Sequence, residues 1–452
     1  MHEKTTVYNV DSWPVGNARE DIGNVINSII DHIKSLQPNK DVGQGGKPGA
    51  VIRIPPGDFR LKTQIRIDIS FLRIEGSGHG FTSSSIRFNL SESDLLATHE
   101  LWPGGSRILV DIDSETFADK GPVAAIVVER QGSPRLSSLE FLDFCLDGIE
   151  FKADGSDSLP QNTYKNGKLG IQILTPNDSV KISGMGFVYL EKAIEINYAD
   201  ALSIHDNFVA ECGSCIELLG WGQASKITDN LIGAGPNGHG IFAENHGGLL
   251  VTSNNIFPRG ASSLTFSGVL RSNVSANRLH AFYPGMVRII DGSSENLLSS
   301  NHLLKDNEPW LPFLGVSNTL NASDGLVIIA GSRNSLIGNH ISIVEDSNSS
   351  QGDKGSPVAI RITSGEGNFV SNNHIISRAI ELNRSADCFE SQVSSITKGF
   401  SQPVLDFLAV EVDAASSGNY ILDSGQIDNV KLDFSSNAFR PTPNVSEYQR
   451  SQ

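Results

Sequence analysis

Asp206 and Glu217 are two carboxylic acids whose positions in the chain suit paired acid and base chemistry. The segments around Ile194 and Ile216 match with a constant offset of 22 residues and no gap, which fixes their register as stacked strands. If Ile216 points into a core, strand alternation turns Glu217 outward. Asp206 falls in a turn eleven residues earlier, and we expect this turn and the strand to lie close together. One carboxyl could then donate a proton and the other accept one, as the cleavage of a glycosidic bond requires.

Two other interpretations of these carboxyls stay open on the residues alone. Asp206 begins a recurring string that starts with Asp or Asn, and such residues favour turns, so its role could be structural. Glu195 occupies the equivalent strand position 22 residues before Glu217, hence about 4.8 Å away if the strands stack in parallel. Because stacked carboxylates raise each other's affinity for a proton, Glu195 and Glu217 form a second candidate pair.

The recurring string defines the organisation of the chain and consists of Asp or Asn, a polar residue and an apolar residue. It begins at Asp206, Asp229, Asn254, Asn277, Asn301, Asn339 and Asn373. The steps are 23, 25, 23 and 24 residues, then 38 and 34 where loops interrupt the period. Short apolar alternations flanked by Gly, Ser and Asn lie between the strings and indicate strands and turns.

A period of this length accommodates about three short strands and three turns, and stacked repeats of that kind pair their backbone groups with the neighbouring repeats. The sequence therefore predicts an all-β fold, a single-stranded parallel β-helix, with the Asp and Asn side chains stacked as a ladder at one turn. A leucine-rich repeat is disfavoured because the Asn- and Gly-rich stretches cannot supply its helical segment.

The domain organisation follows from the same pattern. The 452 residues, with 44 Gly and 38% hydrophobic residues, suffice for one elongated domain over residues 1–452. Asp21 to Leu36 carries apolar residues at helical spacing, which predicts a capping helix over about residues 20–37 that covers the open end of the coil. Rungs are expected over about residues 50–430, with irregular excursions over about 89–124 and 377–416.

Charge and hydropathy exclude several classes of partner. The formal net charge of -16 argues against nucleic acid and anionic membrane surfaces, and it disfavours a polyanionic substrate such as polygalacturonate. No stretch approaches the roughly 20 apolar residues of a membrane span. Met1 to Lys4 lack the apolar core of a signal peptide, which predicts a cytoplasmic protein, or a secreted one if a signal has been removed.

The four cysteines are Cys145, Cys212, Cys215 and Cys388. The spacing of Cys212 and Cys215 matches redox and zinc motifs, but a zinc site needs a second pair of ligands and a thioredoxin-like motif needs a strand-to-helix turn. Neither context is present, so we expect free, buried thiols.

Several long strings resemble the inulin fructotransferases and difructose anhydride hydrolases, which form family 91 of the glycoside hydrolases. The strings are Gly186 to Glu191, Ala199 to Glu217, Ala243 to Thr252, Phe257 to Gly260 and Phe282 to Met286. The resemblance extends from Ile54 to Gly425 and thus covers nearly the whole chain. It implies a right-handed, pectin-lyase-like β-helix, a homotrimer with active sites between subunits, no metal or other cofactor, and a catalytic pair on Asp206 and Glu217.

Within that family the sequence favours a difructose anhydride III hydrolase, which opens the dianhydride to inulobiose. The lack of a signal peptide fits an enzyme that processes an imported small sugar. A loop from Asn89 to Gly105, with Trp102 in it, could cover a compact substrate as a lid. The alternative is an inulin fructotransferase, which releases the dianhydride from inulin by intramolecular fructosyl transfer, and one protein could have both activities.

Further residues are candidates for contacts with the sugar. Glu244 and His246 follow an apolar strand and could hydrogen-bond hydroxyl groups, although a solvated turn explains them equally well. Arg259 could orient a carboxylate or a sugar, and Arg288 is expected to point outward beside the buried Val287. Tyr283 and Trp102 offer apolar faces for furanose rings, although packing explains most such aromatic residues.

Two other classes of β-helix compete with this family. A non-catalytic trimeric spike that binds carbohydrate would show the same rung pattern. A calcium-dependent polysaccharide lyase would need an acidic cluster for the metal and basic residues for a uronate, and neither stands out in the sequence.

Overall fold

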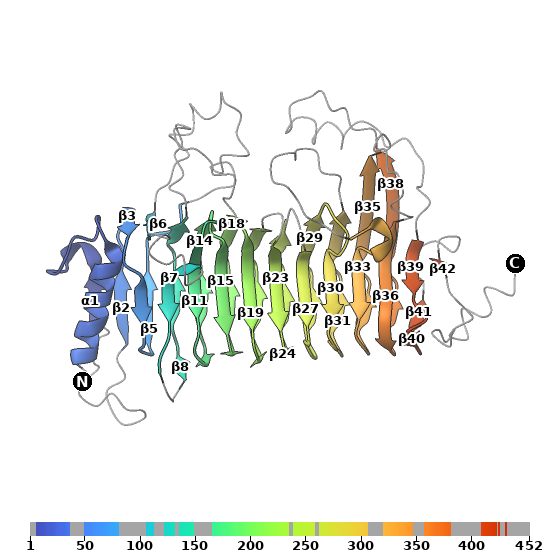
Figure 1. Ribbon diagram of the computed structural model, residues 1–452, viewed down its shortest axis with the longest axis horizontal. Coiled ribbons are helices and arrows are strands. Elements are labelled where there is room, and N and C mark those ends of the chain that lie inside the picture. Colours follow the sequence, from blue (N-terminus) through green and yellow to red (C-terminus); the bar gives the residue numbers. More distant parts are fainter. Residues whose placement is uncertain are drawn as a thin grey trace, which may run out of the picture. The chain divides into compact units, whose positions relative to one another are not determined.

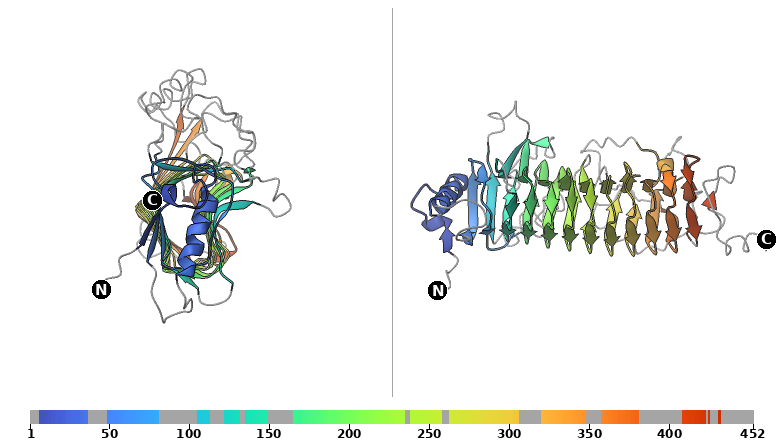
Figure 2. Two further views of the ribbon diagram at one scale, coloured as in Figure 1. Left: turned by 90° about the vertical axis from the view of Figure 1, so that its left-hand side faces the viewer. Right: turned by 90° about the horizontal axis from the view of Figure 1, so that it is seen from below.

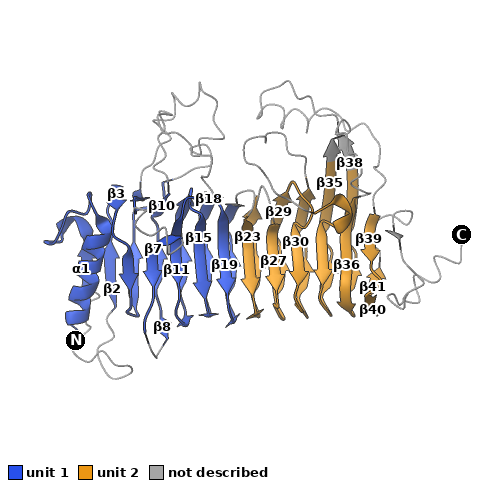
Figure 3. Ribbon diagram, viewed as in Figure 1, with its two compact units in different colours: residues 1–233 blue, residues 234–452 orange. Residues whose placement is uncertain are grey.

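The computed structural model contains two compact units, residues 1–233 and 234–452 (Figure 3). It describes residues 6–36, 49–80, 105–112, 122–131, 135–148, 165–234, 238–257, 262–305, 320–346, 357–380, 408–422, 424 and 430–431. Within each unit, short strands from successive circuits of the chain stack in parallel (Figure 1). The predicted parallel β-helix is therefore confirmed, while the extent of a single domain over residues 1–452 stays a prediction.

Each circuit of the chain, or rung, passes through three parallel sheets. In unit 1 the first sheet contains β1 (Thr6–Asn9), β2 (Ala50–Arg53), β5 (Leu72–Glu75), β9 (Glu140–Leu142), β13 (Lys181–Ser183), β17 (Ser203–His205) and β21 (Lys226–Thr228). The second contains β3 (Gly57–Leu61), β6 (Ser106–Val110), β10 (Cys145–Asp147), β14 (Gly186–Val188), β18 (Phe208–Cys212) and β22 (Leu231–Ala234), the last ending just past the boundary of the unit. The third contains β4 (Ile65–Ile67), β7 (Val123–Val128), β11 (Lys168–Ile173), β15 (Lys192–Asn197) and β19 (Ser214–Leu219). A short fourth sheet at the turn after the third contains β8 (Leu136–Ser137), β12 (Asn177–Asp178), β16 (Ala199–Asp200) and β20 (Gly222–Gln223).

Unit 2 repeats this arrangement. Its first sheet contains β25 (Leu250–Thr252), β28 (Asn273–Ser275), β31 (Leu297–Ser299), β34 (Ser335–Ile337), β37 (Phe369–Ser371) and β41 (Tyr420–Leu422). The second contains β26 (Asn255–Ile256), β29 (Arg278–Ala281), β32 (His302–Lys305), β35 (His340–Asp346) and β38 (His374–Ile380). The third contains β23 (His239–Glu244), β27 (Ser262–Ser267), β30 (Val287–Ile290), β33 (Val327–Ala330), β36 (Val358–Glu366), β39 (Leu408–Val412) and β42 (Val430–Lys431). The short strands β24 (His246–Gly247) and β40 (Ser416–Ser417) follow the third sheet.

The register expected from the offset of 22 residues is confirmed. Ile182 pairs with Ile204 in the first sheet, and Ile194 pairs with Ile216 in the third. All four side chains are fully buried, because each points into the coil and stacks on its neighbour in the next rung. Burying a side chain of this size contributes about 1.5 to 3 kcal/mol.

The predicted capping helix is present as α1 (Ile22–Ser35), which lies at the N-terminal end of the stack (Figure 2), and its apolar residues are buried. The carboxylate of Asp21 caps the helix by accepting a hydrogen bond from the backbone N–H of Gly23 at 3.2 Å. A side chain at Gly23 would lie 1.7 Å from the backbone oxygen of Thr63, so only glycine permits this close approach. The helix thereby covers the N-terminal edge of the stack.

The two predicted excursions are partly wrong. The segment over 89–124 contains β6 and the start of β7, and the segment over 377–416 contains the end of β38 and all of β39. The apolar runs of these strands are short and are flanked by Ser, Arg and acidic residues, so the hydrophobic pattern is too weak to distinguish strand from loop. Among the described residues, no helix is long and apolar enough to cross a membrane.

Candidate functional site

Glu195 and Glu217 meet on the outward face of the third sheet in unit 1, where they are paired in register. Nζ of Lys192 lies 2.6 Å from Oε2 of Glu195 and 2.8 Å from Oε2 of Glu217. Nε2 of Gln172, one rung earlier, donates a hydrogen bond to Oε1 of Glu195 at 2.8 Å. We call Gln172, Lys192, Glu195 and Glu217 the carboxylate cluster.

The carboxylate cluster is largely shielded from solvent. The side chains of Glu195 and Glu217 are each 10% exposed, and that of Lys192 is 31% exposed. Burial alone would lower the pKa of Lys192, but its hydrogen bonds to Glu195 and Glu217 and their charges outweigh burial and raise it. The ammonium group therefore stays charged at neutral pH and compensates two carboxylates that have little water around them.

Asp206 lies in the turn between the first and second sheets and does not belong to the Asn ladder. In unit 1 the ladder residues are Asn207 and Asn230, whose side chains share a hydrogen bond of 2.9 Å. In unit 2 the ladder runs through Asn254, Asn277, Asn301, Asn339 and Asn373. The expectation that Asp206 and Asp229 occupy the ladder is therefore wrong, because each stands one residue before it.

The turn position of Asp206 does not require a carboxyl group. Its backbone takes a left-handed conformation, with φ at 56°. The equivalent positions of other rungs, also with positive φ, are Gly184, Asp229, Ser253, Ala276, Ser300, Gly338 and Asn372. Because glycine, alanine and serine all occupy this turn, the carboxyl of Asp206 is not explained by backbone geometry. The side chain is 65% exposed, and its Oδ2 lies 2.7 Å from Nδ1 of His205.

Asp206 and Glu217 lie before and after β18 within one rung, and their convergence on one groove stays a prediction. Asp206 precedes this strand of the second sheet, and Glu217 follows it on the third sheet. No hydrogen bond or ion pair of the described residues joins the two carboxyls. Five residues of extended chain span roughly 17 Å, so β18 separates the two positions along the rung.

The thiols beside this region are buried and free, as expected. Cys145, Cys212 and Cys215 form no disulfide, and Cys388 lies outside the described residues. Burial raises the pKa of the Cys212 thiol to about 12 and that of Cys215 well above its usual value. Both thiols thus stay neutral and unreactive. Among the described residues, no group of three or more His, Cys, Asp and Glu side chains is placed to hold a metal ion.

Arg288 on β30 reaches back to the loop of unit 2 that contains Tyr283. Tyr283 is half-buried in the loop before β30, and Nε of Arg288 donates to the backbone oxygen of Gly285 in that loop at 3.2 Å. Arg288 points outward in register with Thr265, as predicted from the burial of Val287. Burial lowers the pKa of the Arg288 guanidinium. Arg288 thus offers a partly desolvated cation at the loop that contains Tyr283.

The remaining predicted contacts are dispersed. Glu244 ends β23, two rungs from Arg288 and two residues further along the strand direction. His246 is 2% exposed, so it lies in the interior of unit 2, which favours a structural role. Arg259, Trp102 and the predicted lid over residues 89–104 lie outside the described residues.

Lys192 and Gln172 are the parts of the cluster that the sequence did not predict. Strict alternation would place Lys192 and Glu195 on opposite faces, since they are three residues apart. In the structure both point outward, because Ala193 and Ile194 between them are both fully buried and alternation is interrupted there. The signal that could have found Lys192 is its charge, since it is the cation nearest in sequence to two stacked glutamates.

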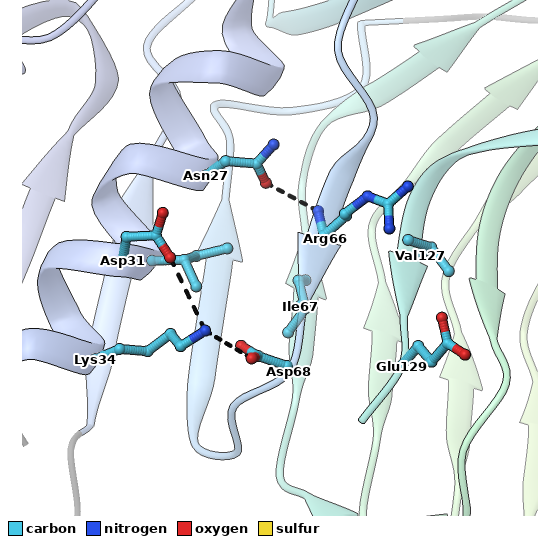
Figure 4. A pocket seen from close by; sticks show the side chains of 9 residues that line it. Asn27, Asp31, Lys34, Arg66, Ile67, Asp68, Val127 and Glu129 are labelled. Atoms are coloured by element: carbon cyan, nitrogen blue, oxygen red, sulfur yellow. Dashed lines mark hydrogen bonds and ion pairs between the residues drawn. The ribbon is translucent and has the colours of Figure 1, made fainter. Parts of the chain in front are cut away.

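One cavity lies away from all of these residues, beneath α1 in unit 1 (Figure 4). Its volume is about 380 Å³. It is lined by Asn27, Ile30, Asp31, Lys34, Arg66, Ile67, Asp68, Val127 and Glu129. Nζ of Lys34 lies 2.6 Å from Oδ2 of Asp68 across it, which ties the capping helix to the first rung of the third sheet. We therefore regard the cavity as part of the cap and do not place chemistry there.

The stacked sheets place the chain in the class of parallel β-helix proteins, and comparison with known proteins gives the family. A family model described as the β-helix repeat of inulin fructotransferase matches residues 300–443. A second model, described as periplasmic copper-binding protein NosD, matches residues 135–310. The DFA-I-forming inulin fructotransferase of Arthrobacter globiformis is 40% identical over 378 residues, which are 82% of this chain and 89% of the relative.

Solved structures agree with this relationship. The DFA-IIIase of Arthrobacter chlorophenolicus A6 in complex with GF2 is 58% identical, has a TM-score of 0.86, and covers 97% of this chain and 100% of its own. A cysteine-to-alanine mutant of that enzyme in complex with DFA-III gives the same identity and coverage and a TM-score of 0.87. The chain belongs to the family of inulin fructotransferases and difructose anhydride hydrolases, family 91 of the glycoside hydrolases, as the sequence resemblance indicated.

Proposed function

We propose that this protein is a difructose anhydride III hydrolase that opens the dianhydride to inulobiose. The observation that carries the proposal is the similarity to the DFA-IIIase of Arthrobacter chlorophenolicus A6, which extends over 97% of this chain at 58% identity and includes a complex with DFA-III. The outward carboxylate of Glu217 and the exposed carboxyl of Asp206 supply the acid and base groups that such a reaction needs.

The reaction requires two proton transfers. A water molecule adds to the anomeric carbon of one fructose while the bond from that carbon to the bridging oxygen breaks. One carboxylate takes a proton from the water, and one carboxylic acid gives a proton to the departing oxygen. Because the second sugar stays linked through its other bridge, the product is a single linear disaccharide. Asp206 and Glu217 are the proposed pair, and Tyr283 and Arg288 are the proposed contacts to the furanose rings.

The second candidate is an inulin fructotransferase. It is supported by the 40% identity with the DFA-I-forming enzyme of Arthrobacter globiformis. In that reaction the 3-hydroxyl of a terminal fructose attacks the anomeric carbon of its neighbour and expels the rest of the chain, so the sugar's hydroxyl replaces water. The same two carboxyls would serve, and one protein could carry both activities.

We further propose that the protein is a homotrimer with its sites between subunits. The separation of Asp206 from Glu217 by β18 supports this assembly, because a neighbouring subunit can bring its Asp206 to Glu217 without a movement of the chain around this strand. The cytoplasmic location stays a prediction, which fractionation of the source cells would check.

The test is chromatography of the products formed from difructose anhydride III and, separately, from inulin, by the wild-type protein and by Glu217→Gln. We expect inulobiose from the dianhydride and a rate at least about 100-fold lower in the variant, since a positioned acid or base contributes a factor of that order. Circular dichroism of both proteins controls for folding.

Other outcomes would assign the protein differently. Dianhydride that accumulates from inulin without opening would make it a fructotransferase. No product from either substrate would reject both enzymatic functions and favour a carbohydrate-binding β-helix.

A further inference from the structure

Lys192 forms ion pairs with both glutamates of the carboxylate cluster, and the hydrogen bonds of the two glutamates differ. Both oxygens of Glu195 are engaged, Oε1 by Gln172 and Oε2 by Lys192. Glu217 is held through Oε2 alone. Within the described part of the chain, no hydrogen bond or ion pair reaches Oε1 of Glu217, so this oxygen is the one that can meet a substrate.

In these surroundings Lys192 is the cation that compensates the carboxylate of Glu217. The neighbouring outward positions on β7 and β11 carry Val127 and Gln172, which are uncharged. The thiol of Cys215, on the same strand as Glu217, is buried, which raises its pKa and keeps it neutral. On the third sheet of unit 1 the charged groups beside Glu217 are Lys192 and Glu195, and the buried carboxyl of Glu211 on β18 also acts on the Cys215 thiol of the same strand. Two stacked carboxylates with little water would share a proton if the ammonium were absent.

We infer that Lys192 is a positioning residue that compensates the charge of Glu217 and fixes its carboxylate, so that Glu217 accepts the proton from the attacking hydroxyl or water while Glu195 takes no part in the proton transfer. The inference rests on the proposed function and assigns the roles within it. Asp206, which is 65% exposed and outside this cluster, is then the group that protonates the departing oxygen. The proton leaves the nucleophile for Oε1 of Glu217, and a second proton passes from Asp206 to the bridging oxygen.

The test compares pH profiles of kcat on difructose anhydride III for the wild-type protein, Lys192→Met and Lys192→Arg. We expect Lys192→Met to lower kcat about 10- to 100-fold at pH 7 and to move the acidic limb of the profile upward by about one pH unit, because an opposite charge at this distance has an effect of that size. KM should change less than about threefold, since the ammonium does not touch the substrate. Lys192→Arg should restore most of kcat and the position of the acidic limb.

A second variant separates the two glutamates. Glu195→Gln removes the competing charge and leaves the ammonium to Glu217 alone, so we expect the acidic limb to move downward and kcat to fall less than about fivefold. Lys226→Met is the matched control, because Lys226 is an exposed lysine on β21 outside the cluster, and its profile should equal that of the wild type. The double variant Glu195→Gln with Lys192→Met does not leave two carboxylates without a cation, so it should fold even if Lys192→Met does not. It should show a low kcat, but its acidic limb should lack the upward shift that Glu195 causes in Lys192→Met.

The outcomes are distinct. An inactive Glu195→Gln, or an unchanged acidic limb in folded Lys192→Met, would overturn the assignment while the hydrolase activity of the wild type stands. A wild-type protein that makes no product from either substrate would instead overturn the proposed function.

Discussion

At the scale of the residue, a comparison of Asp206 with Asp229 can distinguish a structural role of the Asp206 carboxyl from a chemical one. Asp206 and Asp229 occupy the same left-handed turn position in adjacent rungs, with φ at 56° and 58°. Asparagine adopts this conformation readily, so neither Asp206→Asn nor Asp229→Asn should disturb folding. We expect Asp206→Asn to lower the rate on difructose anhydride III at least about 100-fold, while Asp229→Asn retains wild-type rates within about twofold.

The measurement is the initial rate of product formation for both variants, together with their unfolding midpoints in urea. Equal losses of activity in the two variants would mean that the turn, and not the carboxyl of Asp206, matters. A large loss of stability in either would show that the carboxyl supports the backbone after all.

The residues also show where prediction from sequence stops. The outward direction of Glu217 followed from the alternation around Ile216, and the structure confirms it. The place of Lys192 in the carboxylate cluster could not be predicted from alternation. Two consecutive buried residues interrupt the alternation and place Lys192 and Glu195 on the same face. Packing between rungs causes this departure from alternation, and it cannot be predicted from the sequence of one strand.

At the scale of the element, the Asn ladder of unit 2 replaces backbone hydrogen bonds at a turn. Oδ1 of Asn301 accepts from the backbone N–H of Asn277 at 3.1 Å and from its Nδ2 at 2.9 Å. Nδ2 of Asn301 donates to the backbone oxygen of Val274 at 3.0 Å and to Oδ1 of Asn339 at 2.9 Å. Asn301 itself is 3% exposed, so water cannot substitute for these partners.

Asn301→Ala should therefore be strongly destabilising. It leaves buried donors and acceptors without partners, and we expect a loss of about 2 to 4 kcal/mol in the free energy of unfolding. Asn255→Ala is the control, because Asn255 is exposed and its Oδ1 accepts an exposed hydrogen bond from Nη1 of Arg278 at 3.2 Å, so its cost should stay below about 0.5 kcal/mol. Urea unfolding followed by circular dichroism measures both, and equal midpoints for the two variants would contradict the role of the ladder.

The elements were predictable where they repeat. The period of the recurring string gave the rungs, and the apolar spacing of Asp21 to Leu36 gave the capping helix, since both patterns extend over many residues. The ladder register was misplaced by one residue at Asp206 and Asp229, because Asp and Asn serve equally well in a left-handed turn and in a side-chain ladder. Only hydrogen bonding between rungs distinguishes the two positions.

At the scale of the whole molecule, the proposed trimer explains how Asp206 and Glu217 could act on one substrate. Within one chain they lie before and after β18, and in the proposed trimer Asp206 of one subunit would meet Glu217 of a neighbour. A cyclic trimer uses one heterologous contact three times and would create three such sites. Light scattering should then give a mass about three times the chain mass of 48.6 kDa.

Mixed trimers test the shared site directly. Asp206→Asn and Glu217→Gln should each be inactive alone, but their co-expression should restore activity at contacts where an intact Asp206 faces an intact Glu217. Random assembly of equal amounts places that combination at about a quarter of the contacts, so we expect about a quarter of the wild-type rate. Separately purified variants mixed without subunit exchange are the control and should stay inactive. If co-expressed variants also stay inactive while forming trimers, both carboxyls act within one chain, and the chain must bring Asp206 around β18 when the substrate binds.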